Sequence, residues 1–454
     1  MKYATKVSEL QNVFNARELI GDELDKYYYD GTMLARSGWR GISVIDQLHE
    51  ACKQPNAKGA YLLLGHRGCG KSTELNKMSE KLRQEGYLVS TVQCNESLDF
   101  GNPLYADILI LMCDALLQMA KECKCDISGD VRKTIATFWA DANRRTTIER
   151  GEETELAADF GIKAPPVGIP VIGELLSLAV NVKNAIRFRE TTVDEYRSRI
   201  SRRIGEWIST INKVSDSIAK KNGGKRPIVI FEDLDKLDQI NAEHVFFEMT
   251  SSLTGYTFPI VYTFPIALSY NGRFNDLRQQ FADVFRFPMI KIETEKGDLY
   301  PEGYRTIRSI VEKRAALDLF AGSDFFDGEH FGDDSRCEES VLFKMIEKTG
   351  GSLRNLFEVI RDASVLARVN GDACVSREGV EYGLTKLQST LTITIEKKHY
   401  PFLVGICKGE RREIEEREML LEMMQAGVVL EYNGRQWHNV HPLIRDFLGE
   451  IGRL

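Results

Sequence analysis

Residues 65–72 read Gly-His-Arg-Gly-Cys-Gly-Lys-Ser, which matches the pattern GxxxxGK[ST] at every fixed position. The three glycines would let the backbone curl so that successive amides point at phosphate oxygens, where a Cβ would obstruct the approach. In such a loop the lysine reaches the β- and γ-phosphates, and the serine hydroxyl is a magnesium ligand. The octet therefore predicts a site for a nucleoside triphosphate with magnesium. The predicted nucleotide-binding residues are Gly65, His66, Arg67, Gly68, Cys69, Gly70, Lys71, Ser72 and Thr73.

A second group of polar residues lies far along the chain, where an apolar run at 226–231 ends in Glu232, Asp233 and, after one leucine, Asp235. Adjacent carboxylates at the carboxyl end of a buried strand are costly unless they serve a cation or a polarised water. We therefore expect Ser72, Glu232 and Asp233 to form the magnesium site, with Asp233 orienting the attacking water. The commoner order is Asp before Glu, so which acid takes which role stays open. Asp235 is expected to cap the next helix.

Short apolar runs must position both groups of residues. The run at 61–64 has the length of a buried parallel strand and leads directly into the glycine-rich loop. An amphipathic helix at 73–84 follows, and its amino-terminal amides would add to the attraction for phosphate. Further runs predict strands at 87–94, 226–231, 259–264 and 286–292. The predicted fold class is therefore α/β, with a parallel-sheet P-loop NTPase core.

With these motifs the chain resembles the AAA+ ATPases, and within them the origin-recognition-like and the STAND-like or KAP-like branches. In those branches an apolar strand often ends in two acids followed by Leu-Asp, as at 232–235 here. The resemblance covers about residues 41–387 and implies a helical lid on the parallel-sheet core. It also implies ATP, rather than another nucleotide, as the ligand, since no guanine-reading Asn/Thr-Lys-x-Asp motif is obvious.

The resemblance assigns further site residues to this sequence. Thr263 takes the position of the sensor 1 residue, which would touch the γ-phosphate or the attacking water. Arg278 and Arg286 are candidates for an arginine finger that reaches the site of a neighbouring subunit, although a surface arginine at a helix end is the favoured alternative for each. Arg354, in the segment Gly-Gly-Ser-Leu-Arg-Asn-Leu, corresponds to the sensor 2 arginine of the lid. Such an arginine would gain bidentate hydrogen bonds to ATP that it loses with ADP.

The expected domains follow from these landmarks. An N-terminal segment (1–40) precedes the nucleotide-binding domain (41–297), which carries a helical insertion at about 101–222. A helical lid (298–390) comes next, and the C-terminal part (391–454) has the pattern of a winged-helix-like domain. That pattern is a helix at 413–425, a hairpin around Asn433-Gly434 and a final helix at 442–449.

Composition excludes several classes of protein. The 454 residues carry a net charge of −7, with 43% hydrophobic and 28% charged residues, so neither disorder nor general affinity for nucleic acid is indicated. Nine scattered cysteines are typical of a reducing compartment, and the amino-terminal residues lack the apolar core of a signal peptide, so we expect a cytoplasmic protein. The most apolar stretch, 165–182, reads as a buried helix after a Pro/Gly loop, with an interfacial membrane contact as the alternative.

The expected function is an ATPase that uses ATP and magnesium to drive a conformational or assembly switch in a homo-oligomer. Because no nuclease, protease or deaminase signature is visible, we expect a prokaryotic sensor or defence ATPase that acts with a separate protein effector. A DNA-acting initiator or transposition ATPase is one alternative, although basic residues in the C-terminal part are mixed with acids and DNA is not favoured. A nucleotide-binding scaffold with little hydrolysis is another, because of the Glu-Asp order.

Overall fold

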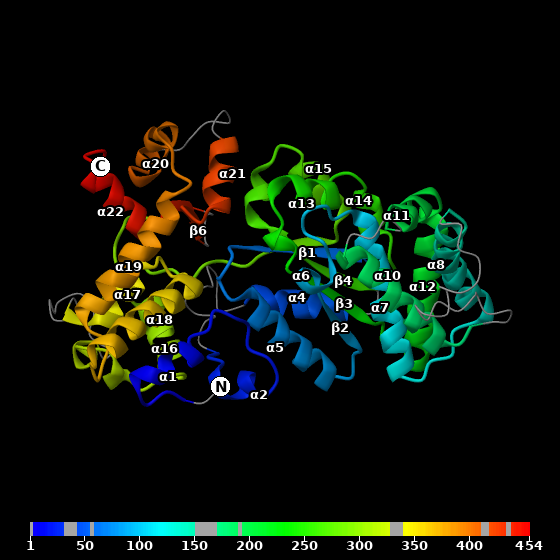
Figure 1. Ribbon diagram of the computed structural model, residues 1–454, viewed down its shortest axis with the longest axis horizontal. Helices are drawn as coiled ribbons and strands as arrows, with labels where there is room; N and C mark the ends of the chain where they lie inside the picture. The colour runs from blue at the N-terminus through cyan, green and yellow to red at the C-terminus, as the bar shows by residue number, and fades with distance from the viewer. Residues whose placement is uncertain are drawn as a thin grey trace.

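A five-stranded parallel sheet lies at the centre of the computed structural model, which describes residues 3–30, 43–54, 59–149, 170–188, 193–326, 339–409, 417–432 and 437–454 (Figure 1). The strand order is β2-β3-β4-β1-β5. Because the strands are parallel, the carboxyl ends of β1 and β3 meet at one edge, with only β4 between them. The strands are β1 (Gly59–Gly65), β2 (Val89–Gln93), β3 (Ile228–Glu232), β4 (Pro259–Pro265) and β5 (Asp283–Arg286).

The last strand corrects the sequence prediction. Residues 286–292 were expected to form it, but β5 ends at Arg286. Phe287 still donates its N–H to the Leu64 carbonyl (2.7 Å), and Pro288 follows. Proline has no N–H to continue the ladder, so the chain leaves the sheet there. The buried Met289 and Ile290 that suggested a strand instead pack in the core.

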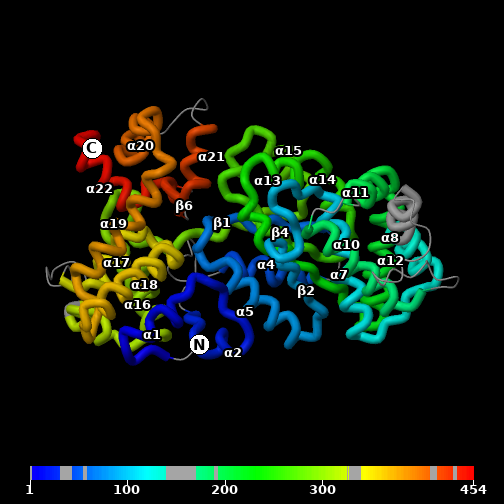
Figure 2. Tube along the Cα trace, in the orientation of Figure 1, coloured from blue at the N-terminus to red at the C-terminus, as the bar shows by residue number. Residues whose placement is uncertain are grey.

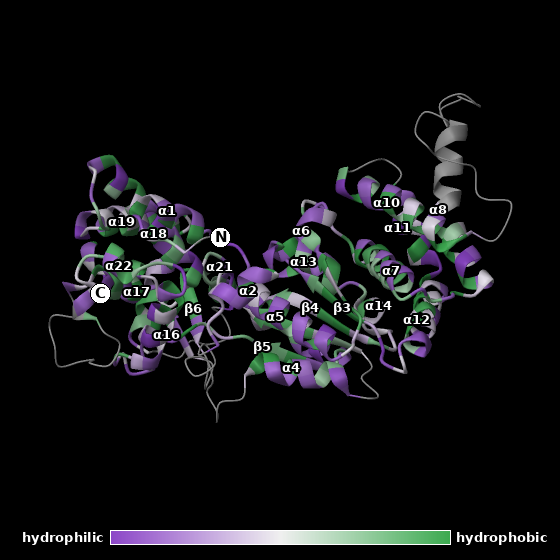
Figure 3. Ribbon diagram, turned by 90° about the horizontal axis from the view of Figure 1, so that it is seen from below, coloured by the Kyte–Doolittle hydropathy of each residue, from purple (hydrophilic) through white to green (hydrophobic). Residues whose placement is uncertain are grey.

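Helices cover both faces of the sheet, since alternate residues of β1 enter two different cores. Tyr61 and Leu63 pack with α4 (Val44–Lys53) and α5 (Lys71–Gln84), whereas Leu62 and Leu64 belong to the larger core on the other face. Figure 3 shows β3 and β4 as hydrophobic strands enclosed by helices. The helices of the larger-core side include α7 (Tyr105–Glu122), α13 (Gln239–Phe246), α14 (Thr250–Thr254) and α15 (Phe274–Gln280), and the short α6 (Cys94–Ser97) follows β2.

The expected insertion is a helical bundle at one end of the molecule (Figure 1). Between residues 193 and 221 the chain forms two helices rather than one, because the backbone at Arg203 leaves the helical region (φ −124°, ψ 34°). The apolar stretch contributes a helix from residue 172 that packs against α7; its earlier residues 165–169 lie outside the described part of the chain. None of the described helices has the length and hydrophobicity needed to span a bilayer. The bundle comprises α7, α8 (Gly129–Glu149), α10 (Ile172–Phe188), α11 (Val193–Arg202) and α12 (Ile204–Lys221).

The lid lies at the opposite end and includes the N-terminal segment. The chain from 7 to 13 packs against α18, and the Phe14 ring contacts the rings of Phe320 and Phe357. Figure 2 shows the blue N-terminal tube against the yellow lid helices. The first lid helix starts at Pro301, since proline is suited to the first turn of a helix. The elements are α1 (Val7–Val13), α2 (Asp22–Tyr27), α16 (Pro301–Glu312), α17 (Val341–Lys348), α18 (Leu353–Asn370) and α19 (Arg377–Thr392).

A C-terminal module follows the lid, and it has the helix, two strands and helix that the sequence predicted. The strands pair antiparallel, with Val429 opposite Val440; the Asn433-Gly434 turn lies outside the described residues. The structure adds α20, which the pattern did not predict. The module consists of α20 (Tyr400–Cys407), α21 (Arg417–Gln425), β6 (Val429–Tyr432), β7 (Trp437–Val440) and α22 (Pro442–Glu450).

Gly303 shows how closely the lid packs on the segment after β5. A Cβ at this position would lie 1.6 Å from the Lys291 carbonyl oxygen, so the backbone would have to move. We expect Gly303→Ala to lower the free energy of unfolding by roughly 3 kcal/mol. Gly205→Ala, on α12 with nothing within 4 Å, is the matched control and should raise the free energy by up to about 1 kcal/mol. Chemical denaturation of both variants measures this, and equal stabilities would contradict the packing.

Candidate nucleotide-binding site

The glycine-rich loop has the curl that the sequence predicted. β1 ends at Gly65, and α5 begins at Lys71 after two glycines with positive φ, Gly68 (79°) and Gly70 (99°). A Cβ at Gly65 would lie 2.7 Å from the Phe287 carbonyl oxygen. Side chains at these positions would therefore strain the loop, which agrees with a backbone shaped to hold phosphate at a helix amino terminus.

Lys71 lies inside the loop and is 5% exposed. Its Nζ donates to the carbonyl oxygens of Gly65 and His66 (2.8 Å each) and pairs with Asp235 Oδ2 (2.8 Å). Burial alone would lower the pKa of Lys71, but the charge of Asp235 raises it above the usual value, so the side chain stays an ammonium at neutral pH.

Glu232 is the most buried of the three acids, with 1% exposure. Neither of its carboxyl oxygens has a hydrogen bond of ordinary geometry within the described residues. Burial raises the pKa of Glu232 to about 8, with Ser72 acting in the opposite direction and Asp233 adding to the rise. A buried, unsatisfied carboxyl beside a serine is the donor set that a hard cation requires.

Ser72 and Glu232 therefore fit magnesium. The part of the chain that the structure describes contains no group of three or more His, Cys, Asp or Glu residues arranged to bind a metal by itself. Magnesium in nucleotide sites usually has one or two protein ligands and completes its shell with phosphates and water. The pair is thus sufficient for a magnesium ion that arrives with a nucleotide.

The other two acids have different partners. Asp233 has a left-handed backbone (φ 71°), and its Oδ1 lies 2.5 Å from Lys236 Nζ. Asp235, expected to cap a helix, is instead the partner of Lys71. The helix cap is Asp238, which accepts a hydrogen bond from the Asn241 N–H (2.8 Å). The prediction failed because the β3 end continues into a short 3-10 turn, Leu234–Lys236, before α13 starts.

Thr263 lies on β4 between the loop and the acids, as predicted, but its hydroxyl is engaged by backbone. It accepts a hydrogen bond from the Leu234 N–H (3.1 Å) and donates to the Phe231 carbonyl (3.2 Å). In this arrangement Thr263 fixes the turn that presents the acids. Contact with a γ-phosphate stays a prediction.

Arg354 meets the loop from the lid. Its backbone N–H donates to the Gly68 carbonyl oxygen (3.4 Å), and a Cβ on Gly68 would lie 2.4 Å from the Arg354 Cβ. Ser352 caps α18 by accepting from the Asn355 N–H (3.3 Å), which fixes the start of the helix that carries Arg354. The Arg354 Nε is buried and has no hydrogen-bond partner among the described residues. The lid therefore places a guanidinium beside the phosphate loop.

The two arginine-finger candidates differ in the structure. Arg286 forms an ion pair with Glu431 of β6, with Nη1 3.1 Å from Oε2. Its guanidinium therefore has a partner within the same chain. Arg278 is exposed on α15. Of the two, only Arg278 is placed on the surface where a neighbouring subunit could meet it.

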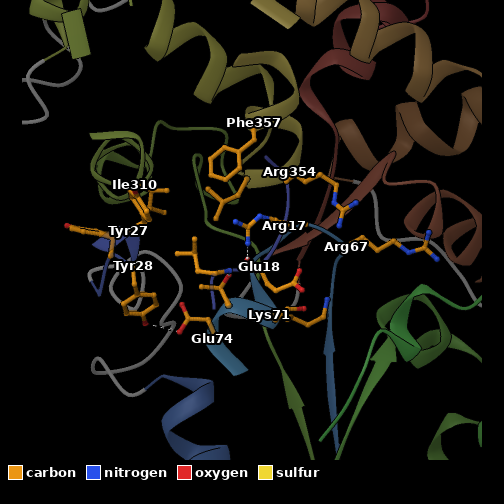
Figure 4. Close-up of a pocket in the computed structure, with 18 of the residues that line it drawn as sticks. Arg17, Glu18, Tyr27, Tyr28, Arg67, Lys71, Glu74, Ile310, Arg354 and Phe357 are labelled. Carbon is orange, nitrogen blue, oxygen red and sulfur yellow. Dashed lines mark hydrogen bonds between the residues drawn. The ribbon is translucent and has the colours of Figure 1, made fainter. Parts of the chain in front are cut away.

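The N-terminal segment forms a wall of the site, which sequence reasoning missed. A pocket of about 950 Å³, including space open to solvent, lies between this segment, the loop and the lid (Figure 4). The Tyr28 hydroxyl donates to Glu74 Oε2 (2.9 Å), and the Leu19 N–H donates to the Thr73 hydroxyl (3.2 Å), which tie the segment to α5. The run of three tyrosines at 27–29 is the local sequence feature that marks this wall of the pocket. Other lining residues are Arg17, Glu18, Arg67, Ile310, Arg314, Leu353 and Phe357.

Arg67, a predicted loop residue, lies on the other side of this pocket. Its Nη2 donates to the Lys236 carbonyl oxygen (2.7 Å), so it links the loop to the turn after the acids. Cys69 is buried, with its Sγ 3.9 Å from the Lys71 Nζ. The loop and the acidic turn are therefore joined by a hydrogen bond within the chain.

The C-terminal module contacts both halves of the site. His66 Nε2 accepts a hydrogen bond from the Glu431 N–H (2.7 Å), and the Tyr432 hydroxyl donates to the Gly350 carbonyl oxygen (2.8 Å). His441 Nε2 lies 3.1 Å from the Asn355 side-chain amide. Neighbouring residues of β6 thus hold the phosphate loop and the start of the lid helix. No local pattern predicted contacts between positions so far apart in the sequence.

Because of His441, the contact between the C-terminal module and the lid should weaken in acid. Burial lowers the pKa of His441 to about 3, and Arg445 adds to the effect. Between pH 6.5 and 3 the unfolded chain binds a proton that the folded His441 does not, so stability is lost as pH falls. From pH 7 to pH 5 this should cost about 2 kcal/mol. His441→Gln should therefore lose less stability than the wild type over this range in urea denaturation; parallel losses would show that His441 is not held neutral.

Comparison with known proteins gives distant structural likenesses only. No protein-family model matches the chain, and no curated protein matches it. Solved structures similar to it include the Aeropyrum pernix ORC2 protein in ADPNP-ADP complexes (13% identity, 96% of this chain and 95% of that chain, TM-score 0.33) and Cdc6p from Pyrobaculum aerophilum (13%, 97% and 96%, 0.33). Another is Drosophila ORC bound to DNA (9%, 99% and 92%, 0.38). Because these TM-scores are low, the assignment of fold depends on the chain's own elements, which are a parallel sheet, a glycine-rich loop between β1 and α5, and a helical lid. They agree with the α/β P-loop core and helical lid that the sequence predicted.

Proposed function

We propose that this chain binds ATP with magnesium at the loop of residues 65–72, hydrolyses it, and uses the difference between ATP and ADP to move its lid and C-terminal module. The observation that carries the proposal is the convergence of Lys71, Ser72 and Glu232 at one edge of the sheet, with Arg354 placed against the same loop by the lid. Three separate segments of the chain supply these groups, and each matches the chemistry of phosphate or magnesium.

Each residue has a defined task in this proposal. The loop amides and Lys71 hold the phosphates, and Ser72 and Glu232 would hold the magnesium ion, which neutralises phosphate charge when bound. Asp233, at the end of the same strand, is the candidate for orienting the attacking water. Apolar and aromatic side chains between the N-terminal segment and the lid, among them Phe357 and Ile310, suit the flat face of a purine base.

The switch follows from the position of Arg354. With ATP bound, its guanidinium can hydrogen-bond the γ-phosphate, whereas with ADP that partner is missing. The helix that carries it, α18, starts beside the Gly350 carbonyl that Tyr432 holds, so lid movement would pass to the C-terminal module.

The wider role that we propose is a sensor or defence ATPase that assembles with copies of itself and acts with a separate protein effector. Arg278, exposed on α15, is the candidate for completing a neighbour's site. The helical insertion and the C-terminal module are the parts placed to contact partners, since they lie at opposite ends of the molecule (Figure 1). A DNA-acting ATPase is the competing role.

Two assays separate these possibilities. Steady-state ATP hydrolysis by the native chain should exceed that of a Lys71→Ala control, and indistinguishable rates would favour a nucleotide-binding scaffold. A mobility shift with duplex DNA should show no complex at physiological salt. A complex whose affinity falls steeply with ionic strength would favour the DNA-acting role, because phosphate contacts release counterions.

A further inference from the structure

The Lys71 ammonium has partners within the chain for all of its donors. An ammonium group has three N–H donors. Here they meet three oxygens at 2.8 Å each: the carbonyls of Gly65 and His66 and the carboxylate of Asp235. Both charged partners are nearly buried, at 5% and 8% exposure, so water screens their attraction little. Lys71 must therefore give up at least one of these bonds to reach a phosphate.

Of these three bonds, the one between Lys71 and Asp235 costs the most free energy to break. The two backbone carbonyls are neutral, whereas the carboxylate would be left as a buried charge close to Glu232 and Asp233. Among the residues that the structure describes, Asp233 is the one of these three acids with another cation, Lys236, paired to it. Removing the positive charge of Lys71 from this acidic group is unfavourable unless a second cation replaces it.

We propose that Asp235 makes nucleotide binding depend on magnesium: the Lys71 ammonium moves from Asp235 to the phosphates when a divalent cation beside Ser72 and Glu232 replaces its charge. This inference rests on the proposed nucleotide site. It assigns to Asp235 a positioning task, since the residue acts through Lys71 and needs no contact with the nucleotide. Free ATP, which brings four negative charges and no metal, would meet an engaged lysine and an uncompensated acidic group.

The test measures ATP affinity by calorimetry with magnesium and with EDTA, in the wild type and in Asp235→Asn. Asparagine has nearly the same shape and can still accept a hydrogen bond from Lys71, so the fold should tolerate it. The wild type should bind ATP far more weakly in EDTA. In Asp235→Asn the ratio of the two dissociation constants should shrink by about tenfold, chiefly because ATP binds more tightly in EDTA. Asp238→Asn, at the cap of α13 three residues after Asp235, is the control and should keep the wild-type ratio.

A second measurement needs no nucleotide. Amine-specific labelling of Lys71, followed by mass spectrometry, should be several-fold faster in Asp235→Asn than in the wild type or in Asp238→Asn. An unchanged dissociation-constant ratio together with unchanged labelling would overturn the inference while leaving the nucleotide site in place. An equal loss of affinity with and without magnesium would also overturn it, because that result assigns Asp235 a structural role only. Absence of ATP binding by the wild type in magnesium would instead remove the proposed function itself.

Discussion

Replacing Lys71 with alanine should weaken the binding of ATP with magnesium by about two orders of magnitude or more. Lys71 supplies the positive charge at the start of α5 and lies inside the loop that would hold the phosphates. Charge-assisted hydrogen bonds to two phosphates contribute about 3 kcal/mol or more, and 1.4 kcal/mol corresponds to about tenfold in affinity. Isothermal titration calorimetry with a non-hydrolysable ATP analogue measures the loss directly.

The control is Lys81→Ala, which removes a lysine from the exposed side of the same helix, where its Nζ lies 3.9 Å from Asp46. Its affinity should match that of the wild type. Because Lys71→Ala also leaves Asp235 without its partner, circular dichroism must show that the variant is folded. A folded Lys71→Ala protein that keeps micromolar affinity would place the nucleotide somewhere other than the loop.

The second large effect concerns Glu232, whose conversion to glutamine should reduce the turnover number by roughly 10²–10³-fold. The affinity for ATP should change by less than about tenfold, since Lys71 and the loop amides stay in place. The reason is position: Glu232 is buried at the end of β3 beside Ser72, where a carboxylate can serve the magnesium ion or the reacting water. Single-turnover hydrolysis, together with direct binding, separates the chemical step from affinity.

Glu232→Gln should remain folded, so its loss of turnover can be assigned to the chemical step. Burial raises the pKa of Glu232 to about 8, so the folded carboxyl costs stability that grows as pH rises from about 4.5 to 8. Glutamine resembles the protonated form, and Glu232→Gln should therefore be at least as stable as the wild type at pH 7. Asp233→Asn is the comparison, because asparagine tolerates the left-handed backbone there. With the roles proposed above, Asp233→Asn should also lower the turnover number, and an unchanged turnover number in Asp233→Asn would instead give the water-orienting role to Glu232.

The sequence predicted the parts of the site that depend on local pattern. The P-loop follows from glycine spacing, and the buried strands β1, β3 and β4 follow from short apolar runs, so their convergence at one sheet edge was predictable from parallel topology alone. Arg354 was placed near the loop only through the resemblance to a family. No spacing rule connects it with Gly68, which lies far away in the chain.

Other features depend on tertiary contacts that local pattern does not contain. Asp235 could be a helix cap or an ion-pair partner from sequence alone, and the choice was made by the 3-10 turn that delays α13. The final strand was misplaced because residues 287–292 are as apolar as a strand, although Pro288 ends the ladder. The contact of His66 with the Glu431 N–H uses a backbone donor, which leaves no sequence signal at all.

A structure of the chain with magnesium and a non-hydrolysable ATP analogue tests the central claim most directly. The account predicts the triphosphate within the curl of residues 65–72, the metal on Ser72 with Glu232 beside it, and Lys71 moved from Asp235 to the phosphates. A loop that keeps its nucleotide-free contacts while the analogue binds elsewhere, or does not bind, would contradict it.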